Sequence, residues 1–331
     1  MKNVYLLSTL ALLLAPACAA DGDAGNGPTG NPSTGSGDTT ASTGSGAGGD
    51  TGSTTTSGAG GMAPMPENVV LLIPDSSEDA IGIYDAEDGT FLGNFLEPNT
   101  ESDAWVLSTP INAVQGPNGN IFVSDQVEDA VLEFDTGGAF VGIFADETDG
   151  LNNIRGIDFL DGDLLVSNSD GEAINRFDAA GSALPDFVAN PDFDPYDVFI
   201  APNGDVLVSQ IAPVDEVQLY PMASPSGMSQ LYATSFPQQV NATPDGNYLV
   251  ASFSDDTVTE VTGSGQVVRT VEVESARGAY VLGNGNWLVT GGTETGILEI
   301  DPDTGTTVTV IAEGSGFRFI EPVELGANAP R

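Results

Sequence analysis

Histidine is absent from this chain of 331 residues, and cysteine occurs once, at Cys18. Lysine also occurs once, at Lys2, within a segment that we expect to be removed. The lack of histidine excludes a Ser-His-Asp triad, a histidine general base and histidine-ligated zinc. The lack of further lysine excludes Ser-Lys and Schiff-base catalysis, and a single cysteine excludes a disulfide within the chain. Carboxylates, arginines, tyrosines and oxygen-ligated divalent metals are the chemistry that is left.

Basic residues are scarce as well. The chain has 7 lysines and arginines against 48 aspartates and glutamates, for a formal net charge of -41 at pH 7. Nucleic acid and anionic membrane surfaces repel such a chain, so we expect no nucleic-acid partner. We expect a monomer whose partner is an unidentified protein, glycan or small-molecule ligand. Solubility, or life in a salty medium that screens the repulsion, is sufficient to explain the acidity.

Residues 1–18 have the pattern of a secretory signal, with Lys2 followed by an apolar run and then small residues. The end of this segment, LAPAC at residues 14–18, resembles a bacterial lipobox, in which the cysteine receives a lipid after cleavage. The resemblance implies that the protein is exported and anchored to the cell envelope through Cys18, with the outer membrane as the expected location. The alternative is ordinary cleavage, which gives a secreted or periplasmic protein.

Residues 19–66 consist almost entirely of Gly, Ser, Thr, Ala, Asp, Asn and Pro. Such a segment cannot bury enough apolar surface to fold, so we expect a disordered linker with a reach of roughly 40 Å. Residues 67–331 follow as one large all-β domain. We expect the linker to join this domain near Asn68, on the face opposite its ligand-binding mouth.

A short pattern recurs through the all-β domain: a turn glycine, a polar residue, an apolar run and a small polar end. Its copies are GNIFVSD, GDLLVSN, GDVLVSQ, GNYLVAS and GNWLVTG, which begin at residues 119, 162, 204, 246 and 285, with NVVLLIPD at 68–75 as a sixth. A period near 42 residues with several strands per repeat is typical of a β-propeller. The sequence therefore predicts one blade for each copy.

Each repeat divides into four strands, which we name a to d. In the second repeat they are residues 111–116, 120–125, 130–135 and 139–144, with glycine-containing turns at 117–119 and 136–138. Strand c is apolar on both faces in every copy, as expected for a blade between two neighbours. The first repeat lacks strand a, and FRFIEPVEL at 317–325 lacks strands b to d. We expect this C-terminal strand to complete the first of six blades and close the ring.

The repeats resemble NHL-type repeats of six-bladed propellers over residues 67–331. The second repeat, TPINAVQGPNGNIFVSDQVEDAVLEFDTGGAFVGIF, carries the likeness best, and the third adds Arg155-Gly156-Ile157 and Phe177-Asp178. The resemblance implies the fold but no single function, because propellers of this kind include binding proteins, scaffolds and enzymes.

The start of each strand a is expected to face one mouth of the central channel. The residues expected there are Asn112, Arg155, Asp197, Gln239, Arg277 and Glu321. Arg155, Arg277 and Arg318 all fall on strand a or at its beginning, although arginine is rare in this chain. Such a cluster can clamp a carboxylate or another anion. The alternative is that the arginines form ion pairs with Asp197, Glu321 and Glu324 inside the channel.

A metal site is a second hypothesis. Glu321, Asn112 and Asp197 are similar to the Glu, Asn and Asp set that holds one divalent metal in gluconolactonase-like propellers. That resemblance implies Ca²⁺ or another divalent metal, and hydrolysis of small esters or lactones. Our leading hypothesis is instead a binding or interaction module at the cell envelope, with no cofactor and no assigned catalytic residue.

Overall fold

The computed structural model describes residues 69–98, 104–190, 192–292 and 295–326. All of them lie in the second of two compact units, Gly58–Arg331. The predictions for the signal segment 1–18, for Cys18 and for the linker 19–66 fall outside the described residues. Within the described ranges, no helix has the length and apolar character needed to cross a bilayer.

The described residues form six antiparallel sheets of four strands, which confirms the predicted six-bladed β-propeller. Blade 1 contains β24 (Glu321–Glu324), β1 (Val69–Asp75), β2 (Ala80–Asp85) and β3 (Phe91–Leu96). Blade 2 contains β4 (Pro110–Gln115), β5 (Ile121–Asp125), β6 (Ala130–Phe134) and β7 (Phe140–Ala145). Blade 3 contains β8 (Ile154–Leu160), β9 (Asp163–Asn168), β10 (Ala173–Phe177) and β11 (Ala183–Ala189). Blade 4 contains β12 (Pro195–Ile200), β13 (Val206–Gln210), β14 (Glu216–Tyr220) and β15 (Ser229–Ala233). Blade 5 contains β16 (Pro237–Ala242), β17 (Tyr248–Ser252), β18 (Thr257–Val261) and β19 (Val267–Glu272). Blade 6 contains β20 (Ala276–Val281), β21 (Trp287–Gly291), β22 (Gly296–Asp301) and β23 (Thr306–Ala312). The 3-10 helices η1 (Glu147–Asp149), η2 (Pro221–Ala223) and η3 (Pro225–Gly227) lie between strands.

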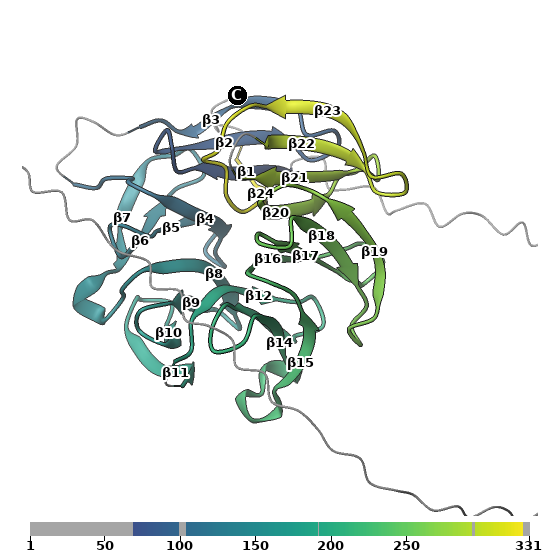
Figure 1. The fold of residues 1–331 in the computed structure, drawn as a ribbon. Coiled ribbons are helices and arrows are strands. Elements are labelled where there is room, and N and C mark those ends of the chain that lie inside the picture. Colours follow the sequence, from purple (N-terminus) through teal and green to yellow (C-terminus); the bar gives the residue numbers. More distant parts are fainter. Residues whose placement is uncertain (1–68, 99–103, 191, 293–294, 327–331) are drawn as a thin grey trace, which may run out of the picture. The chain divides into compact units, whose positions relative to one another are not determined.

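The blades surround a common axis, and strand a of each blade lies innermost (Figure 1). The a–b turns use residues that accept positive φ, as predicted. In blade 2 the turn contains Gly119 at φ 85°, and in blade 3 Asp161 and Gly162 at φ 53° and 95° join Leu160 directly to Asp163. The blade 3 turn is therefore shorter than the blade 2 turn, which affects the alignment of the inner strands.

Strand c supplies the core between blades, as its apolar pattern predicted. Its β-branched position is fully buried in all six blades, for example at Ile81 and Val131. The position three residues later is also buried, with Tyr84 and Phe134 as examples. Both faces of each sheet therefore pack against neighbours, and the hydrophobic core is divided into clusters that span adjacent blades.

The C-terminal strand closes the ring as predicted. β24 pairs with β1 through contacts that include Val69 with Glu324 and Leu72 with Glu321, and an isolated bridge joins Asp75 to Phe317. Val69, the first described residue, lies at the a–b turn end of blade 1 because Glu324 is its partner. The chain before Val69 lies outside the described residues, so its expected approach from the face opposite the mouth stays a prediction.

A β-bulge interrupts strand a at the same place in the blades. The pairing of strand a with strand b skips one residue after Pro110, Pro195 and Ala276, and does so at equivalent places in the other blades. Hydroxyl groups on strand b hold the bulge of the next blade. Ser209 donates to the Gln238 carbonyl at 2.6 Å and Thr290 donates to the Arg318 carbonyl at 2.6 Å. The bulge determines how far along the channel each later side chain of strand a lies.

Candidate functional site

The strand pairing sorts the inner residues into levels along the channel. The mouth level holds the bulge residues Ile111, Arg155, Tyr196, Gln238, Arg277 and Arg318. The middle level, one residue later, holds Asn112, Gly156, Asp197, Gln239, Gly278 and Phe319. The lower level, two residues later again, holds Val114, Asp158, Phe199, Asn241, Tyr280 and Glu321.

The predicted single ring of six site residues is therefore wrong. Arg155 and Arg277 belong to the mouth level, Asn112, Asp197 and Gln239 to the middle level, and Glu321 to the lower level. Arg155 was misaligned because the short Asp161-Gly162 turn removes one residue between strand a and the turn glycine. For blade 6 a signal was available, since Gly278 has the same spacing of seven to Gly285 that Asn112 has to Gly119.

Side chains of the middle level connect neighbouring inner strands. Asn112 donates to the Ile157 carbonyl at 3.2 Å, and Asp197 accepts the Val240 N–H at 2.9 Å. Gln239 reaches two strands, because its carbonyl oxygen accepts the N–H of Ala279 and of Ile320, and its amide donates to the Ile320 carbonyl. These residues satisfy backbone groups that the bulges leave unpaired.

Three carboxyl groups meet in the middle and lower levels, and none of them forms an ion pair within the described part of the chain. Burial raises the pKa of Asp158 to about 7. Burial, and then the charge of Asp158, raises the pKa of Asp197 to about 8. Burial, followed by repulsion from Asp158 and Asp197, raises the pKa of Glu321 well above its usual value, although hydrogen bonds from Gln239 and Asn112 oppose the shift. Burial and mutual repulsion therefore favour the protonated forms of these carboxyl groups.

The oxygen atoms of the proposed metal set are largely engaged by the protein. Glu321 interacts with both Asn112 and Asp197, so the structure does bring these three residues together. However, Gln239 donates to Glu321 Oε1, the Ala113 N–H occupies Asn112 Oδ1, and the Val240 N–H occupies Asp197 Oδ2. Among the described residues, no cluster of three or more His, Cys, Asp or Glu side chains has the arrangement of a metal site.

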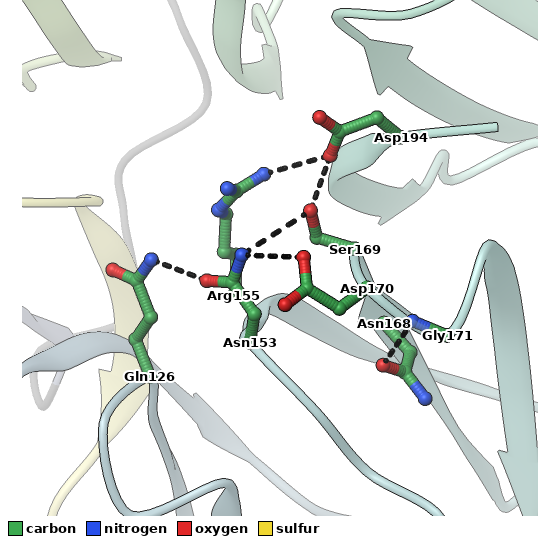
Figure 2. A network of polar contacts seen from close by, with 8 residues as sticks. All are labelled: Gln126, Asn153, Arg155, Asn168, Ser169, Asp170, Gly171 and Asp194. Atoms are coloured by element: carbon green, nitrogen blue, oxygen red, sulfur yellow. Dashed lines mark hydrogen bonds and ion pairs between the residues drawn. The ribbon is translucent and has the colours of Figure 1, made fainter. Parts of the chain in front are cut away.

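Arg155 forms the best-connected part of the mouth level (Figure 2). It is 8% exposed, and its Nη1 lies 3.1 Å from Asp194 Oδ1, which also accepts a hydrogen bond from Ser169. The guanidinium carbon lies 4.4 Å from the centre of the Tyr196 ring. Arg155 Nε is buried and has no hydrogen-bond partner in the described chain. One donor of this guanidinium is thus held in place without an acceptor.

Arg277 and Arg318 complete the mouth level on the opposite blades. Arg277 donates to the Ser315 carbonyl at 2.8 Å and lies 5.5 Å from the centre of the Phe253 ring, while its buried Nε has no partner among the described residues. Arg318 donates from Nε to Ser76 Oγ at 2.8 Å. Burial, and then the charge of Arg318, lowers the pKa of Arg277 to about 10. Both arginines are therefore charged at neutral pH, close enough to repel each other.

The expected ion pairs with Asp197, Glu321 and Glu324 are wrong. Among the described residues, the four ion pairs are Arg155 with Asp194, Arg176 with Asp163, and Arg269 with Glu260 and with Asp303. The channel acids lie deeper than the arginines, because the bulge moves the arginines toward the mouth. Arg277 and Arg318 are thus half-buried cations without a carboxylate within ion-pair distance in the described chain, although the charge of Asp75 still favours the charged form of Arg318.

Sequence reasoning missed the aromatic residues of this mouth. Tyr196 occupies the bulge of blade 4, and Phe236 and Phe253 lie just outside β16 and β17. Phe236 and Phe253 sit in loops, where the repeat pattern makes no prediction. Asp194, the partner of Arg155, also precedes its strand rather than lying on it. Tyr196 had one available signal: the next residue, Asp197, has the same spacing of seven to its turn glycine, Gly204, that Asn112 has to Gly119.

No family model and no curated protein matches the sequence. Solved structures match the fold. A chain from the nidogen–laminin complex has 12% identity and a TM-score of 0.65, covering 77% of this chain and 98% of that one. A Bacteroides caccae protein of unknown function has 16% identity and a TM-score of 0.53, covering 78% and 99%. A gluconolactonase-like protein has 15% identity and a TM-score of 0.50, covering 64% and 81%. At these identities the likeness establishes the propeller fold alone.

Proposed function

We propose that this chain is an exported, lipid-anchored β-propeller that binds an anionic ligand, carboxylate-bearing by preference, at the mouth level of its channel. The observation that supports the proposal most strongly is the placement of Arg277 and Arg318. In a chain with 48 acidic residues, these two half-buried cations lie near each other with no carboxylate within ion-pair distance among the described residues.

Burial makes such a pair costly unless a ligand neutralises it. Desolvation disfavours both guanidinium groups, and the charge of Arg318 adds to the effect on Arg277. Guanidinium forks bind carboxylates through paired, charge-assisted hydrogen bonds. An anion between Arg155, Arg277 and Arg318 would relieve the repulsion between their charges.

The remaining parts of the proposal rest on the sequence. The lipobox-like end at Cys18 and the Gly/Ser/Thr-rich segment 19–66 support a tethered protein at the cell envelope. The position of Val69 at the a–b turn end supports a mouth that points away from the attachment. The NHL-like repeats are consistent with a binding role. We do not advance the metal-dependent hydrolase, because the oxygens of Glu321, Asn112 and Asp197 already serve the backbone and Gln239.

Thermal unfolding in different sodium salts tests the proposal. Any salt screens the net charge of this chain, so acetate, sulfate and phosphate must each be compared with chloride at equal ionic strength. We expect acetate to raise the unfolding midpoint above that in chloride, because a bound ligand stabilises the folded state by mass action. Identical midpoints in all four salts would contradict the proposal, since they would show screening alone.

Arginine variants locate the effect. Arg277→Gln and Arg318→Gln should each abolish the excess stabilisation by acetate. Arg176→Gln is the matched control, because it removes the same charge from an arginine of β10 that pairs with Asp163 away from the mouth. The control should keep the full acetate effect. Loss of the effect in all three variants would mean that net charge, and not the mouth, is responsible.

A further inference from the structure

Aromatic rings form a continuous arc beside the arginines. Ring centres are separated by 6.1 Å between Phe319 and Tyr196, 5.4 Å between Tyr196 and Phe236, and 5.5 Å between Phe236 and Phe253. The four residues come from blades 1, 4 and 5, or from the loops beside their strands. The arc therefore joins several blades, from the buried Phe319 in the middle level to Phe236 and Phe253 beside the mouth, and is not the core of one blade.

Two rings of the arc, Tyr196 and Phe253, support guanidinium groups. Arg155 lies over Tyr196 at 4.4 Å and Arg277 lies over Phe253 at 5.5 Å. A guanidinium that stacks on a ring uses its flat face and leaves its N–H groups pointing outward in its own plane. The unpartnered Nε atoms of Arg155 and Arg277 are such groups. The rings thus fix the direction of the donors.

Phe236, in the middle of the arc, has a strained backbone. Its φ is +53°, in the left-handed region that bulky residues avoid. Equivalent positions just before strand a in blades 3 and 6 have the same conformation, but they carry Asn153 and Ser275. Polar contacts hold Phe236, since its N–H donates to Asp215 and its carbonyl accepts the Phe253 N–H at 3.0 Å. Strain of this kind collects at ligand sites.

The rings at the Phe253 end of the arc are partly exposed. Phe319 is fully buried and Tyr196 is 6% exposed, whereas Phe236 and Phe253 are only half-buried. The partly exposed rings Phe236 and Phe253, next to the charged arginines, give the mouth an apolar side and a cationic side. Acetate or an inorganic anion would use only the cationic side. A ligand that uses both must carry a flat apolar group next to its negative charge.

We propose that the ligand class is an aromatic carboxylate, whose carboxylate binds Arg155, Arg277 and Arg318 and whose ring packs against Phe236 and Phe253. This inference rests on the proposed anion-binding function and names the chemistry that selects among anions. The ring contributes affinity through apolar burial and edge-to-face contacts. The carboxylate contributes it through charge-assisted hydrogen bonds.

Calorimetric titration of the full chain with benzoate, acetate and benzamide tests the inference. We expect benzoate to bind at least tenfold more tightly than acetate, and benzamide, which lacks the charge, to give no measurable binding. Equal affinity for benzoate and acetate would overturn the aromatic preference while leaving the anion site intact. Failure of every carboxylate to bind would overturn both this inference and the proposed function.

Phe236→Asn separates the contribution of the ring. Asparagine stands at the equivalent left-handed position of blade 3, as Asn153, so the variant should fold without added strain. It should lose at least fivefold in affinity for benzoate and keep its affinity for acetate. Phe91→Asn, which removes a half-exposed ring on β3, is the matched control and should change neither affinity. An unchanged benzoate-to-acetate ratio in Phe236→Asn would overturn the inference.

Discussion

The carboxyl group of Asp197 accepts the Val240 backbone N–H at 2.9 Å, which ties the inner strand of blade 4 to that of blade 5. Asp197 is 2% exposed, and no ion pair of the described chain involves it. Burial, and then the charge of Asp158, raises its pKa from 3.8 to about 8. The group therefore carries a proton in the folded protein where an unfolded chain would be ionised.

Stability should consequently fall as pH rises from about 4 to about 8. In this range the folded state holds a proton on Asp197 that the unfolded state has lost, so raising the pH favours unfolding by up to about 1.4 kcal/mol per pH unit. Asp197→Asn removes this linkage. Urea unfolding between pH 4 and pH 8 should show a shallower slope for the variant, which should be the more stable protein at pH 8.

Glu272→Gln is the control for the effect of net charge. Glu272 is exposed at the end of β19, so the substitution removes one negative charge from the rim of the propeller. Its slope should match that of the wild-type protein. If Asp197→Asn and Glu272→Gln have the same slope, Asp197 does not hold a proton in the folded state.

The hydroxyl groups that hold the bulges should contribute unequally to stability. Ser209 donates to the Gln238 carbonyl at 2.6 Å, so Ser209→Ala should lower the free energy of unfolding by about 1–2 kcal/mol. Ser167, at the equivalent position of blade 3, is buried with no hydrogen-bond partner in the described chain. Ser167→Ala should therefore be neutral or slightly stabilising. Equal losses in chemical denaturation would contradict this assignment.

Closure of the ring by the C-terminal strand should dominate the stability of blade 1. Ile320 is fully buried just before β24, in the cluster that joins blades 6 and 1. Ile320→Ala should cost about 2–5 kcal/mol, as is usual for such truncations in a core. Ile143→Ala, at a residue of β7 that is 50% exposed, should cost far less. Similar thermal midpoints for the two variants would show that closure contributes little.

The fold could be predicted from the sequence because its signals repeat. The glycine of each a–b turn and the buried positions of strand c, such as Val131 and Phe134, recur in register, and errors in one copy are corrected by the others. The site could not be assembled in the same way. The bulge on strand a leaves no composition signal, and the one-residue difference at Asp161-Gly162 moves Arg155 from the middle level to the mouth level.

Glu321 shows a second limit of the sequence. Strand b of its blade lies at the other end of the chain, so no a–b turn follows β24 to set its position. Its true level depends on the pairing with Leu72, a contact between residues far apart in sequence. The same applies to Phe236 and Phe253, which meet the arginines through loops whose paths no repeat determines. The cluster of arginines was predicted, and its partners were not.

The proposed anchoring depends on Cys18. In a bacterial host, metabolic labelling with a fatty acid should mark the wild-type protein, and mass spectrometry should find the lipid on the N-terminal cysteine of the mature chain. Cys18→Ser should abolish labelling and release the protein from the membrane fraction. Ala20→Ser, two residues later, should keep both properties. Unlabelled wild-type protein in the soluble fraction would favour ordinary signal cleavage.

The central claim, that Arg155, Arg277 and Arg318 hold an anion, can be tested directly by nuclear magnetic resonance. Of the seven lysines and arginines, Lys2 is the single lysine, which leaves six arginines and a simple spectrum of Nε–H groups after selective nitrogen-15 labelling. Single Arg→Gln variants assign the signals. On titration with benzoate, against chloride at equal ionic strength, the Nε–H signals of Arg155 and Arg277 should move and saturate, while those of Arg176 and Arg269 should stay. If all arginine signals move alike, or none moves, the mouth level is not an anion site.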